Sequence, residues 1–323
     1  MTEGIYRLKR PAAEENQSLV LTPFEDISGF LIRHLGRILL FGMTCTSVIA
    51  VLLIFYFVCR EAFPFLTEGD LAEFLTSAHW YPEAGVPEFG ALALIVGSLY
   101  VTAGSLIIAV PIGILTAVFL SDIVNTRIRN IVKPVIEILA AIPSVAYGFF
   151  AVLVLAPWLQ HRFGFTSGTN ALNASLILSI MALPTIISVA EDSISAIGRE
   201  LREASYGLGS TRFETIFKVV LPAAHSGIIA GIVLGMMRAI GETMVVWMAS
   251  GNANQIPHPW WDISQSVRTI TATIAGDMGE TVKGSIHYRA LFALGVLLLV
   301  ITFMMNLVSE YFLFRAKRKL KSK

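Results

Sequence analysis

The chain has 323 residues, of which 55% are hydrophobic and only 15% are charged, and its formal net charge is +1. Soluble domains are usually about a quarter charged and less than half apolar, so a mean hydropathy of +0.70 excludes an ordinary soluble domain and favours lipid as the solvent. The near-neutral charge gives no support for a nucleic-acid partner, and the six histidines and two cysteines show no metal-ligand spacing.

Six apolar runs are long enough to cross a membrane, which takes about 20 helical residues. The sequence therefore predicts an all-α integral membrane protein with six transmembrane helices. Pro111, Pro143 and Pro184 lie inside such runs, where neighbouring helices can satisfy the carbonyl that a proline leaves free. The predicted spans are Ile38–Val58, Ala91–Leu120, Val135–Leu159, Leu172–Ala190, Ala223–Ala249 and Ala290–Phe314.

The two ends of the chain are polar and flank this apolar domain. Residues 1–37 are predicted to form a cytoplasmic segment in which Phe24–Leu35 is a short amphipathic helix at the membrane interface. The first apolar run is too long for the core of a signal peptide and lacks a small-x-small cleavage site, so we expect it to be retained as a span. Residues 38–314 then form the six-span domain, and residues 315–323 form a basic cytoplasmic tail.

Positive charge is segregated between the two sides of the predicted spans. Of the 24 lysines and arginines, eighteen lie in the termini and the even-numbered loops, five lie in the opposite loops, and Arg238 lies inside a span. The positive-inside rule therefore places both termini of this multi-pass membrane protein in the cytoplasm.

The sequence also predicts the partners of three acidic residues and the location of one outward loop. Glu137 is expected to pair with Lys133 or Arg129, while Glu191 and Asp192 are expected to cap the cytoplasmic end of the fourth span. The outward loop 250–289 contains the segment TITATIAGDMGE, which is apolar enough to pack against the membrane or to dip into it.

The long cytoplasmic loop 199–222 carries residues at a distinctive spacing, in the segment ELREASYGLGSTRFETIFKVVLPAA. A glycine permits a turn at Gly209, so we expect one helix before it and a second from about Thr211 to Val219. Pro222 is expected to stop the second helix and to start the fifth span. The alternative is a solvated amphipathic loop, which does not need this spacing of glycine and proline.

This segment resembles the EAA loop of ABC importer permeases, whose pattern is E-A-A-x3-G-x9-I-x-L-P, with Ser205 in place of the second alanine and Val219 in place of isoleucine. The resemblance implies that the loop docks in a groove of a cytoplasmic ATPase and transmits its closure to the spans. The small residues Ala204 and Ser205 would let that partner approach closely. The coupling residues so implied are Glu203, Ala204, Ser205, Gly209, Leu221 and Pro222.

The sequence carries no catalytic motif of its own. It has no G-x4-G-K-[ST] sequence, and the GLGSTR stretch at Gly207 lacks the lysine of a phosphate-binding loop. The spans also lack a nucleophile–base pair and a metal-ligand set, which argues against a membrane enzyme. We therefore expect a non-catalytic chain without a cofactor, while a partner ATPase binds ATP and Mg.

Several stretches resemble the bacterial high-affinity phosphate (Pst) permeases from about Trp80 to Asn306, among them KPVIEILAAIPSVAYGFFAV, RAIGETMVVWMASGN and HYRALFALGVLLLVITFMMN. The last two are closer to the C-type subunit than to the A-type. The resemblance implies a type I ABC importer permease in the bacterial plasma (inner) membrane. It also implies a homologous A-type permease as heterodimer partner, two ATP-binding subunits and an outer phosphate-binding protein.

Two charged residues in the fifth span are the candidate substrate path. Arg238 is predicted near mid-depth, where a charge costs at least about 2.5–3.5 kcal/mol unless it is paired or hydrated. Glu242 follows four residues later and is predicted on the same helix face. Arginine suits a phosphate oxyanion because its planar fork donates two parallel hydrogen bonds. A structural ion pair is the alternative reading.

Two other kinds of transporter stay open at this point. The same machine carrying sulfate or molybdate would have a similar loop, although the RAIGETM and HYRALFALG stretches favour phosphate. A secondary carrier or channel would be expected to show an inverted repeat and no ATPase-docking loop, and we find no convincing repeat.

Overall fold

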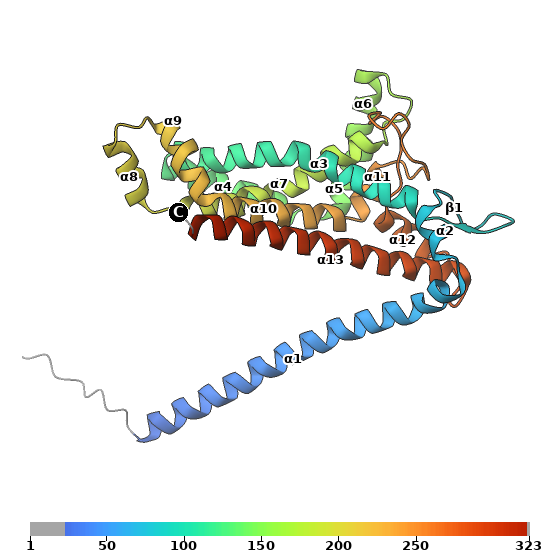
Figure 1. The fold of residues 1–323 in the computed structure, drawn as a ribbon, viewed down its shortest axis with the longest axis horizontal. Coiled ribbons are helices and arrows are strands. Elements are labelled where there is room, and N and C mark those ends of the chain that lie inside the picture. Colours follow the sequence, from blue (N-terminus) through green and yellow to red (C-terminus); the bar gives the residue numbers. More distant parts are fainter. Residues whose placement is uncertain (1–22, 322–323) are drawn as a thin grey trace, which may run out of the picture. The chain divides into compact units, whose positions relative to one another are not determined.

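A computed structural model of the chain describes residues 23–321, and most of them are helical (Figure 1). The chain packs as two units, residues 1–57 and residues 58–323. The elements in chain order are α1 Pro23–Glu68, α2 Leu71–Thr76, β1 Trp80–Tyr81, β2 Glu88–Phe89, α3 Leu92–Val118, η1 Phe119–Ile123, α4 Thr126–Ala141, α5 Ser144–Phe150, η2 Ala151–Leu155, α6 Ala156–Phe163, α7 Ala171–Ser195, α8 Arg199–Gly207, α9 Arg212–Thr215, η3 Ile216–Val220, α10 Leu221–Gly241, α11 Met244–Ala249, α12 Ile270–Met278 and α13 Ile286–Lys321, the three η segments being π-helical.

Six helices among the described residues are long and apolar enough to cross a membrane, which confirms the predicted number. They cover residues 34–68, 92–123, 144–163, 171–195, 212–241 and 286–311. Each one overlaps a predicted span, because hydropathy over about 20 residues identifies a spanning helix more reliably than it locates its ends.

The first unit, within the described residues, is the part of α1 from Pro23 to Phe57. The predicted interfacial helix Phe24–Leu35 is continuous with the predicted first span, since no break separates the two. Most of the large apolar side chains from Leu35 to Phe57 are exposed, as expected of a surface that faces lipid or another chain. The interfacial location stays a prediction, and residues 1–22 lie outside the described part.

In the second unit, α3 and α7 pack closely along their lengths. Small residues make this possible: a Cβ on Gly104 would lie 2.6 Å from Ser175 Oγ, and one on Gly113 would lie 2.7 Å from a methyl carbon of Ile186. Packing through small residues is the usual way in which membrane helices approach one another without a hydrophobic driving force. α7 is accordingly the most buried of the six candidate spans.

The predicted third span, Val135–Leu159, is wrong in its boundaries. Residues 135–141 end a separate amphipathic helix, α4, and the chain breaks at Ile142 and Pro143 before α5 begins. The break has a local cause, because a proline disfavours helical geometry in the residue before it. The third span is instead the continuous run of α5, η2 and α6 from Ser144 to Phe163.

The predicted fifth span, Ala223–Ala249, is also wrong as one helix. α10 ends at Gly241, Glu242 has an extended backbone with ψ 134°, and the short helix α11 follows. At its other end, α9, η3 and α10 form one helical run from Arg212, so Pro222 does not stop a helix as predicted. A proline has no N–H to donate, and the π-helical turn of η3 just before it accommodates the missing hydrogen bond.

Part of the outward loop packs against the bundle, while its relation to the membrane stays a prediction. Ile270, Ala272 and Thr273 of α12 are buried, and Ile270 shares a core cluster with Leu291 and Leu294 of α13. In Figure 1, α8 and α9 lie at one end of this bundle, near the C-terminal end of α13, and α12 and β1 lie at the other end.

Candidate functional site

Arg238 lies in the last turn of α10, and only some of the hydrogen-bond donors of its guanidinium have partners among the described residues. Its Nη2 donates one long hydrogen bond, 3.5 Å, to the carbonyl oxygen of Ala140 in α4. Its Nε is buried and has no hydrogen-bond partner among the described residues. Buried polar atoms are nearly always hydrogen-bonded, so a guanidinium with an unused donor is an available site for an acceptor.

Glu242 does not lie on the helix face of Arg238, because the helix ends one residue earlier. It is the C-cap of α10, and its backbone carbonyl accepts a hydrogen bond of 2.8 Å from the hydroxyl of Thr271. The described residues contain no ion pair between Arg238 and Glu242 within 4.0 Å. The predicted side-by-side geometry on one helix is therefore wrong.

Hydroxyl groups surround Glu242, and the sequence analysis missed them. A small cavity of about 10 Å³, the space of roughly one water molecule, is lined by Glu242 together with Ser98 and Thr102 of α3 and Thr269 and Thr271 at α12. Such a lining can donate to or accept from a polar solute. Hydroxyls spaced along α3 and the TITAT stretch were the available signal, but hydropathy alone does not distinguish them from packing residues.

The coupling loop has the predicted two-helix form. α8 ends at Gly207, and Gly209 then adopts φ +83°, a left-handed conformation that favours glycine. The next helix begins with a capping box, in which the Thr211 hydroxyl accepts from the Glu214 amide and the Glu214 carboxylate accepts from the Thr211 amide. The glycine turn is therefore confirmed by the backbone.

The coupling residues do not all face the same way. Glu203 and Ala204 are exposed, whereas Ser205 is buried and shares a hydrogen bond of 2.9 Å with the Thr215 hydroxyl. Ser205 therefore ties α8 to α9 and does not offer a surface for close approach, contrary to the prediction. Leu208 and Phe213 are the most exposed apolar side chains of the loop, with 88% and 68% of their surface exposed.

Leu221 and Pro222 lie where the loop joins α10. Leu221 packs at the edge of a core cluster that includes Ala190 and Ile194 of α7 and Ile216 of η3. α9, η3 and α10 form one continuous helical run, so no non-helical residue separates the end of the loop from the spanning helix.

A buried ion cluster fixes α4 to the end of α7. The carboxylate of Glu191, only 1% exposed, pairs with Arg129 and, at 2.7 Å, with Lys133, which also bonds Asp192 at 2.6 Å. Glu137 does not take these partners, so that predicted pairing is wrong. Burial opposes the charge of Lys133, but hydrogen bonds to Asp192 and Glu191 outweigh it and raise the pKa of that amine.

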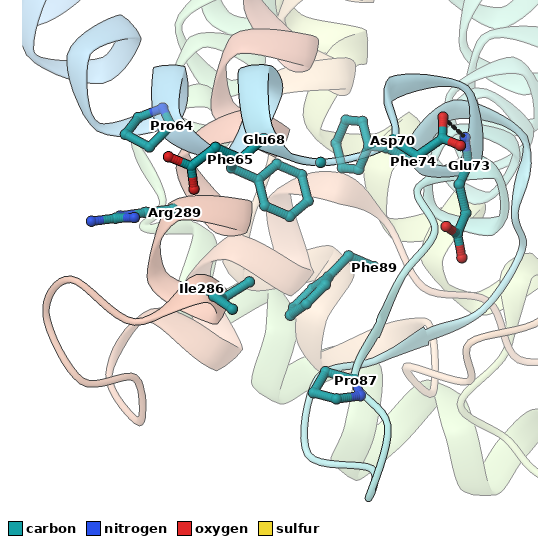
Figure 2. Close-up of a pocket in the computed structure, with 11 residues that line it drawn as sticks. Pro64, Phe65, Glu68, Asp70, Glu73, Phe74, Pro87, Phe89, Ile286 and Arg289 are labelled. Atoms are coloured by element: carbon teal, nitrogen blue, oxygen red, sulfur yellow. Dashed lines mark hydrogen bonds between the residues drawn. The ribbon is translucent and has the colours of Figure 1, made fainter.

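A separate cavity of about 360 Å³ lies where the end of α1 meets α2, β2 and the start of α13 (Figure 2). Phe65, Phe74 and Phe89 line it, with the ring of Phe65 edge-on to the other two at 5.4 and 5.6 Å. Glu68 and Glu73 add carboxylates to the lining. Neither Arg238 nor Glu242 belongs to it, so this cavity is distinct from the candidate substrate path.

Within the part of the chain that the structure describes, no group of three or more His, Cys, Asp or Glu side chains is arranged to hold a metal ion.

Comparison with known proteins assigns this chain to a family. The profile of the binding-protein-dependent transport system inner membrane component matches residues 109–318. The probable ABC transporter permease protein YqgH of Bacillus subtilis is 40% identical over 254 residues, which cover 78% of this chain and 81% of the relative. The phosphate transport system permease protein PstC of Mesorhizobium japonicum is 37% identical, with coverage of 75% and 78%.

Solved structures agree on the fold. A chain of a bacterial alginate ABC transporter aligns with a TM-score of 0.58 at 18% identity and covers 87% of this chain and 96% of its own length. A chain of the inward-facing MetNI methionine ABC transporter aligns with a TM-score of 0.52, also at 18% identity, over 70% of this chain and 94% of its own length. At such identities the likeness concerns the fold alone.

The fold and its glycine-turn loop define a multi-pass membrane permease of the ABC-importer type. The chain belongs to the family of binding-protein-dependent transport system inner membrane components. It is therefore a non-catalytic membrane subunit of a transport system.

Proposed function

We propose that this chain forms half of the translocation path of an ATP-driven phosphate importer. The single observation that supports an anion such as phosphate as the substrate is Arg238, a partly buried arginine inside a spanning helix with an unused Nε donor. A phosphate oxygen is a natural acceptor for that donor, since the guanidinium fork matches an oxyanion. The relatives that are named phosphate transport permeases support the same substrate.

Glu242 has a second role in this proposal. Phosphate near neutral pH still carries at least one O–H donor, which a carboxylate beside the path can accept. Sulfate offers only acceptors to the same carboxylate and is repelled, so an unfavourable contact with the wrong ligand gives selectivity. Another oxyanion such as sulfate or molybdate remains the competing substrate, and a secondary carrier is the competing mechanism.

The exposed face of the coupling loop is the proposed contact with a cytoplasmic ATPase, which binds ATP and Mg. Glu203, Ala204, Leu208 and Phe213 provide a partly apolar surface on it, and the continuous helix into α10 supplies a path for the motion. The complete machine would contain a homologous second permease as heterodimer partner, two copies of the ATP-binding subunit and an outer phosphate-binding protein.

The proposed topology puts both termini in the cytoplasm. The segregation of lysine and arginine supports it, and so does the position of the coupling loop and the C-terminal end of α13 at the same end of the bundle (Figure 1). Thiol labelling of a Ser322→Cys variant should occur only after the cells are permeabilised. Labelling from outside intact cells would reverse the topology.

Uptake of labelled phosphate tests the function directly. The gene would be expressed with its partner subunits in a strain that lacks other phosphate transporters, and uptake would be measured against excess unlabelled sulfate. We expect ATP-dependent phosphate uptake that sulfate does not inhibit. Uptake driven by an ion gradient, or preferential uptake of sulfate, would contradict the proposal.

A further inference from the structure

A polar cavity of about 670 Å³ lies beneath the coupling loop, separate from the candidate substrate path. One wall is formed by η1 and the N-terminal part of α4, the second by the end of α7, and the third by α8 and α9 of the loop. Four arginines line it: Arg129, Arg199, Arg202 and Arg212.

Positive charge is in excess around this cavity. Arg129 is paired with Glu191, and Arg202 is paired with Asp122 at 3.0 Å. Arg212 bonds only a backbone carbonyl, that of Asp122, and Arg199 makes no ion pair among the described residues. Two arginines therefore have guanidinium charge that no carboxylate neutralises, which is the usual composition of an anion site.

The start of α8 adds to this field. Gly198 and Arg199, at its first turn, line the cavity, and no side chain caps the amide groups of this nine-residue helix. Free amides at a helix N-terminus favour a negative ligand.

Asp122 gives the independent observation that points to a particular ligand. Its side chain is only 9% exposed and lines the cavity, yet its Oδ2 has no hydrogen-bond partner among the described residues. A carboxylate oxygen can only accept, so the ligand that satisfies it must bring a donor. A ligand that fits both features is anionic and also carries an O–H or N–H group.

We propose that this cavity binds a phosphate group that carries a hydrogen-bond donor, with Arg199 and Arg212 as the charge partners and Asp122 as the acceptor. Two sources offer that chemistry: inorganic phosphate, and the headgroup of an anionic lipid such as phosphatidylglycerol, which has hydroxyls beside its phosphate. Basic pockets between helices near the cytoplasmic surface are known to hold lipid headgroups.

Because of the position of the cavity, a bound phosphate group would affect the movement of the loop. Its walls belong to the membrane-spanning bundle on one side and to the coupling loop on the other, so a bound phosphate group holds α8 and α9 against η1 and α7. Occupancy would then oppose movement of the loop. This consequence rests on the proposed function, whereas the binding itself does not.

Binding is tested on the full chain, purified and placed in phosphatidylcholine nanodiscs. An Arg238→Gln background removes the candidate path site, so that only the cavity is measured. Equilibrium dialysis with labelled inorganic phosphate compares this protein with an added Arg199→Gln/Arg212→Gln pair. Each arginine contributes roughly tenfold through a charge-assisted hydrogen bond, so we expect about a hundredfold weaker binding for the pair.

Arg127→Gln is the matched control, since Arg127 is an exposed arginine of α4 that does not line the cavity. It should leave phosphate binding unchanged. Asp122→Asn tests the acceptor: its amide can donate to sulfate, so the preference for phosphate over sulfate should narrow. Arg199→Gln alone removes no side-chain hydrogen bond or ion pair among the described residues, so it keeps the test valid if the double variant or Asp122→Asn unfolds.

A second arm separates the two sources. Native mass spectrometry counts phosphatidylglycerol retained by the same variants from mixed nanodiscs. Loss of free phosphate binding in the double variant supports inorganic phosphate, and loss of lipid retention alone supports the headgroup. If the double variant and Arg127→Gln match the Arg238→Gln background in both assays, the site does not exist. Failure of the transport proposal would instead be seen in the uptake assay, which does not use these variants.

Discussion

Two regions of this bundle handle buried positive charge in opposite ways. At the junction of α4 and α7, Arg129 and Lys133 are held by the carboxylate of Glu191, which is 1% exposed. At the end of α10, Arg238 has one long hydrogen bond to a carbonyl and a buried Nε with no partner among the described residues. The first arrangement is complete without a ligand, and the second is not.

The first region therefore has a structural charge cluster, and the second holds the arginine that we propose to be functional. A buried pair that satisfies itself is strongly destabilised when one partner is removed, because the other charge is left without compensation. A partly satisfied charge inside a spanning helix is costly to the fold, and such charges usually mark the path of a solute or ion. Substitutions at the two regions should therefore affect different measurements.

The largest effect is expected for Arg238→Gln. Phosphate uptake should fall roughly a hundredfold or more, since two charge-assisted hydrogen bonds to the anion, about 3 kcal/mol together, are lost. Arg238→Lys should also transport poorly, because lysine keeps the charge but not the planar fork. The protein level and the thermal unfolding of the complex should stay near those of the parent.

Arg127→Gln, an exposed arginine on α4, is the matched control and should transport normally. If Arg238→Gln transports at the parental rate with normal expression, Arg238 is a structural residue and the comparison between the two regions fails.

The next effect is on stability, at Glu191. Glu191→Gln leaves Arg129 and Lys133 facing a neutral amide, and we expect a loss of about 3–5 kcal/mol of unfolding free energy. Denaturant unfolding of the purified chain measures it, with Glu137→Gln as the control because Glu137 is exposed and makes no ion pair among the described residues. Equal stability of the two variants would show that the cluster contributes nothing beyond solvation.

Gly209→Val should have an intermediate effect on coupling. An added Cβ at Gly209 meets nothing within 4 Å, so the cost comes from the backbone at φ +83° and not from a clash. Holding a β-branched residue there costs about 1–3 kcal/mol, which should displace α8 relative to α9. We expect loss of substrate-stimulated ATP turnover in the assembled complex.

Gly207→Val makes the same change two residues earlier, at a helical glycine with open space around it. It should largely retain the stimulation. Normal transport by Gly209→Val would mean that the loop is a linker without a required shape.

The sequence predicted the parts of this structure that depend on composition and on short motifs. The number of spans follows from hydropathy. The turn at Gly209 follows from the residue type, because glycine adopts a left-handed backbone conformation without steric cost. The breaks at Pro143 and Glu242 were missed because both lie inside apolar runs, where hydropathy does not change across the break. Pro143 was read as a tolerated interior proline, although its restriction on the preceding residue was available.

The partners of the charged residues could not be predicted from spacing. Glu137 lies one helical turn from Lys133 and was its expected partner, but α7 brings Glu191 and Asp192 to the same lysine across 58 and 59 residues of chain. The i,i+4 spacing of Arg238 and Glu242 failed for another reason, since the helix does not reach the second residue. Long-range packing determines the partners of Lys133 and the relation of Arg238 to Glu242, and no local sequence pattern predicts such packing.

The smallest effect is expected for Glu242→Gln, and it tests whether the two charged residues act together. Among the described residues no ion pair within 4.0 Å joins them, although the two charges attract. Removing the carboxylate therefore takes no hydrogen bond from Arg238, and stability should change little. The glutamine amide presents N–H donors where the carboxylate presented only acceptors. Phosphate would exchange a charged acceptor for the weaker, neutral carbonyl of the amide, and sulfate would gain a donor. We therefore expect phosphate uptake to fall several-fold, about 1 kcal/mol, while inhibition by sulfate rises.

Thr271→Val is the control at the same cavity, because it removes the hydroxyl that bonds the Glu242 backbone without changing the charge. This variant should lower uptake without changing the preference for phosphate over sulfate. If Glu242→Gln loses uptake as completely as Arg238→Gln and keeps its selectivity, then the carboxylate positions the arginine through the surrounding hydroxyls, and discrimination between the anions lies elsewhere in the path.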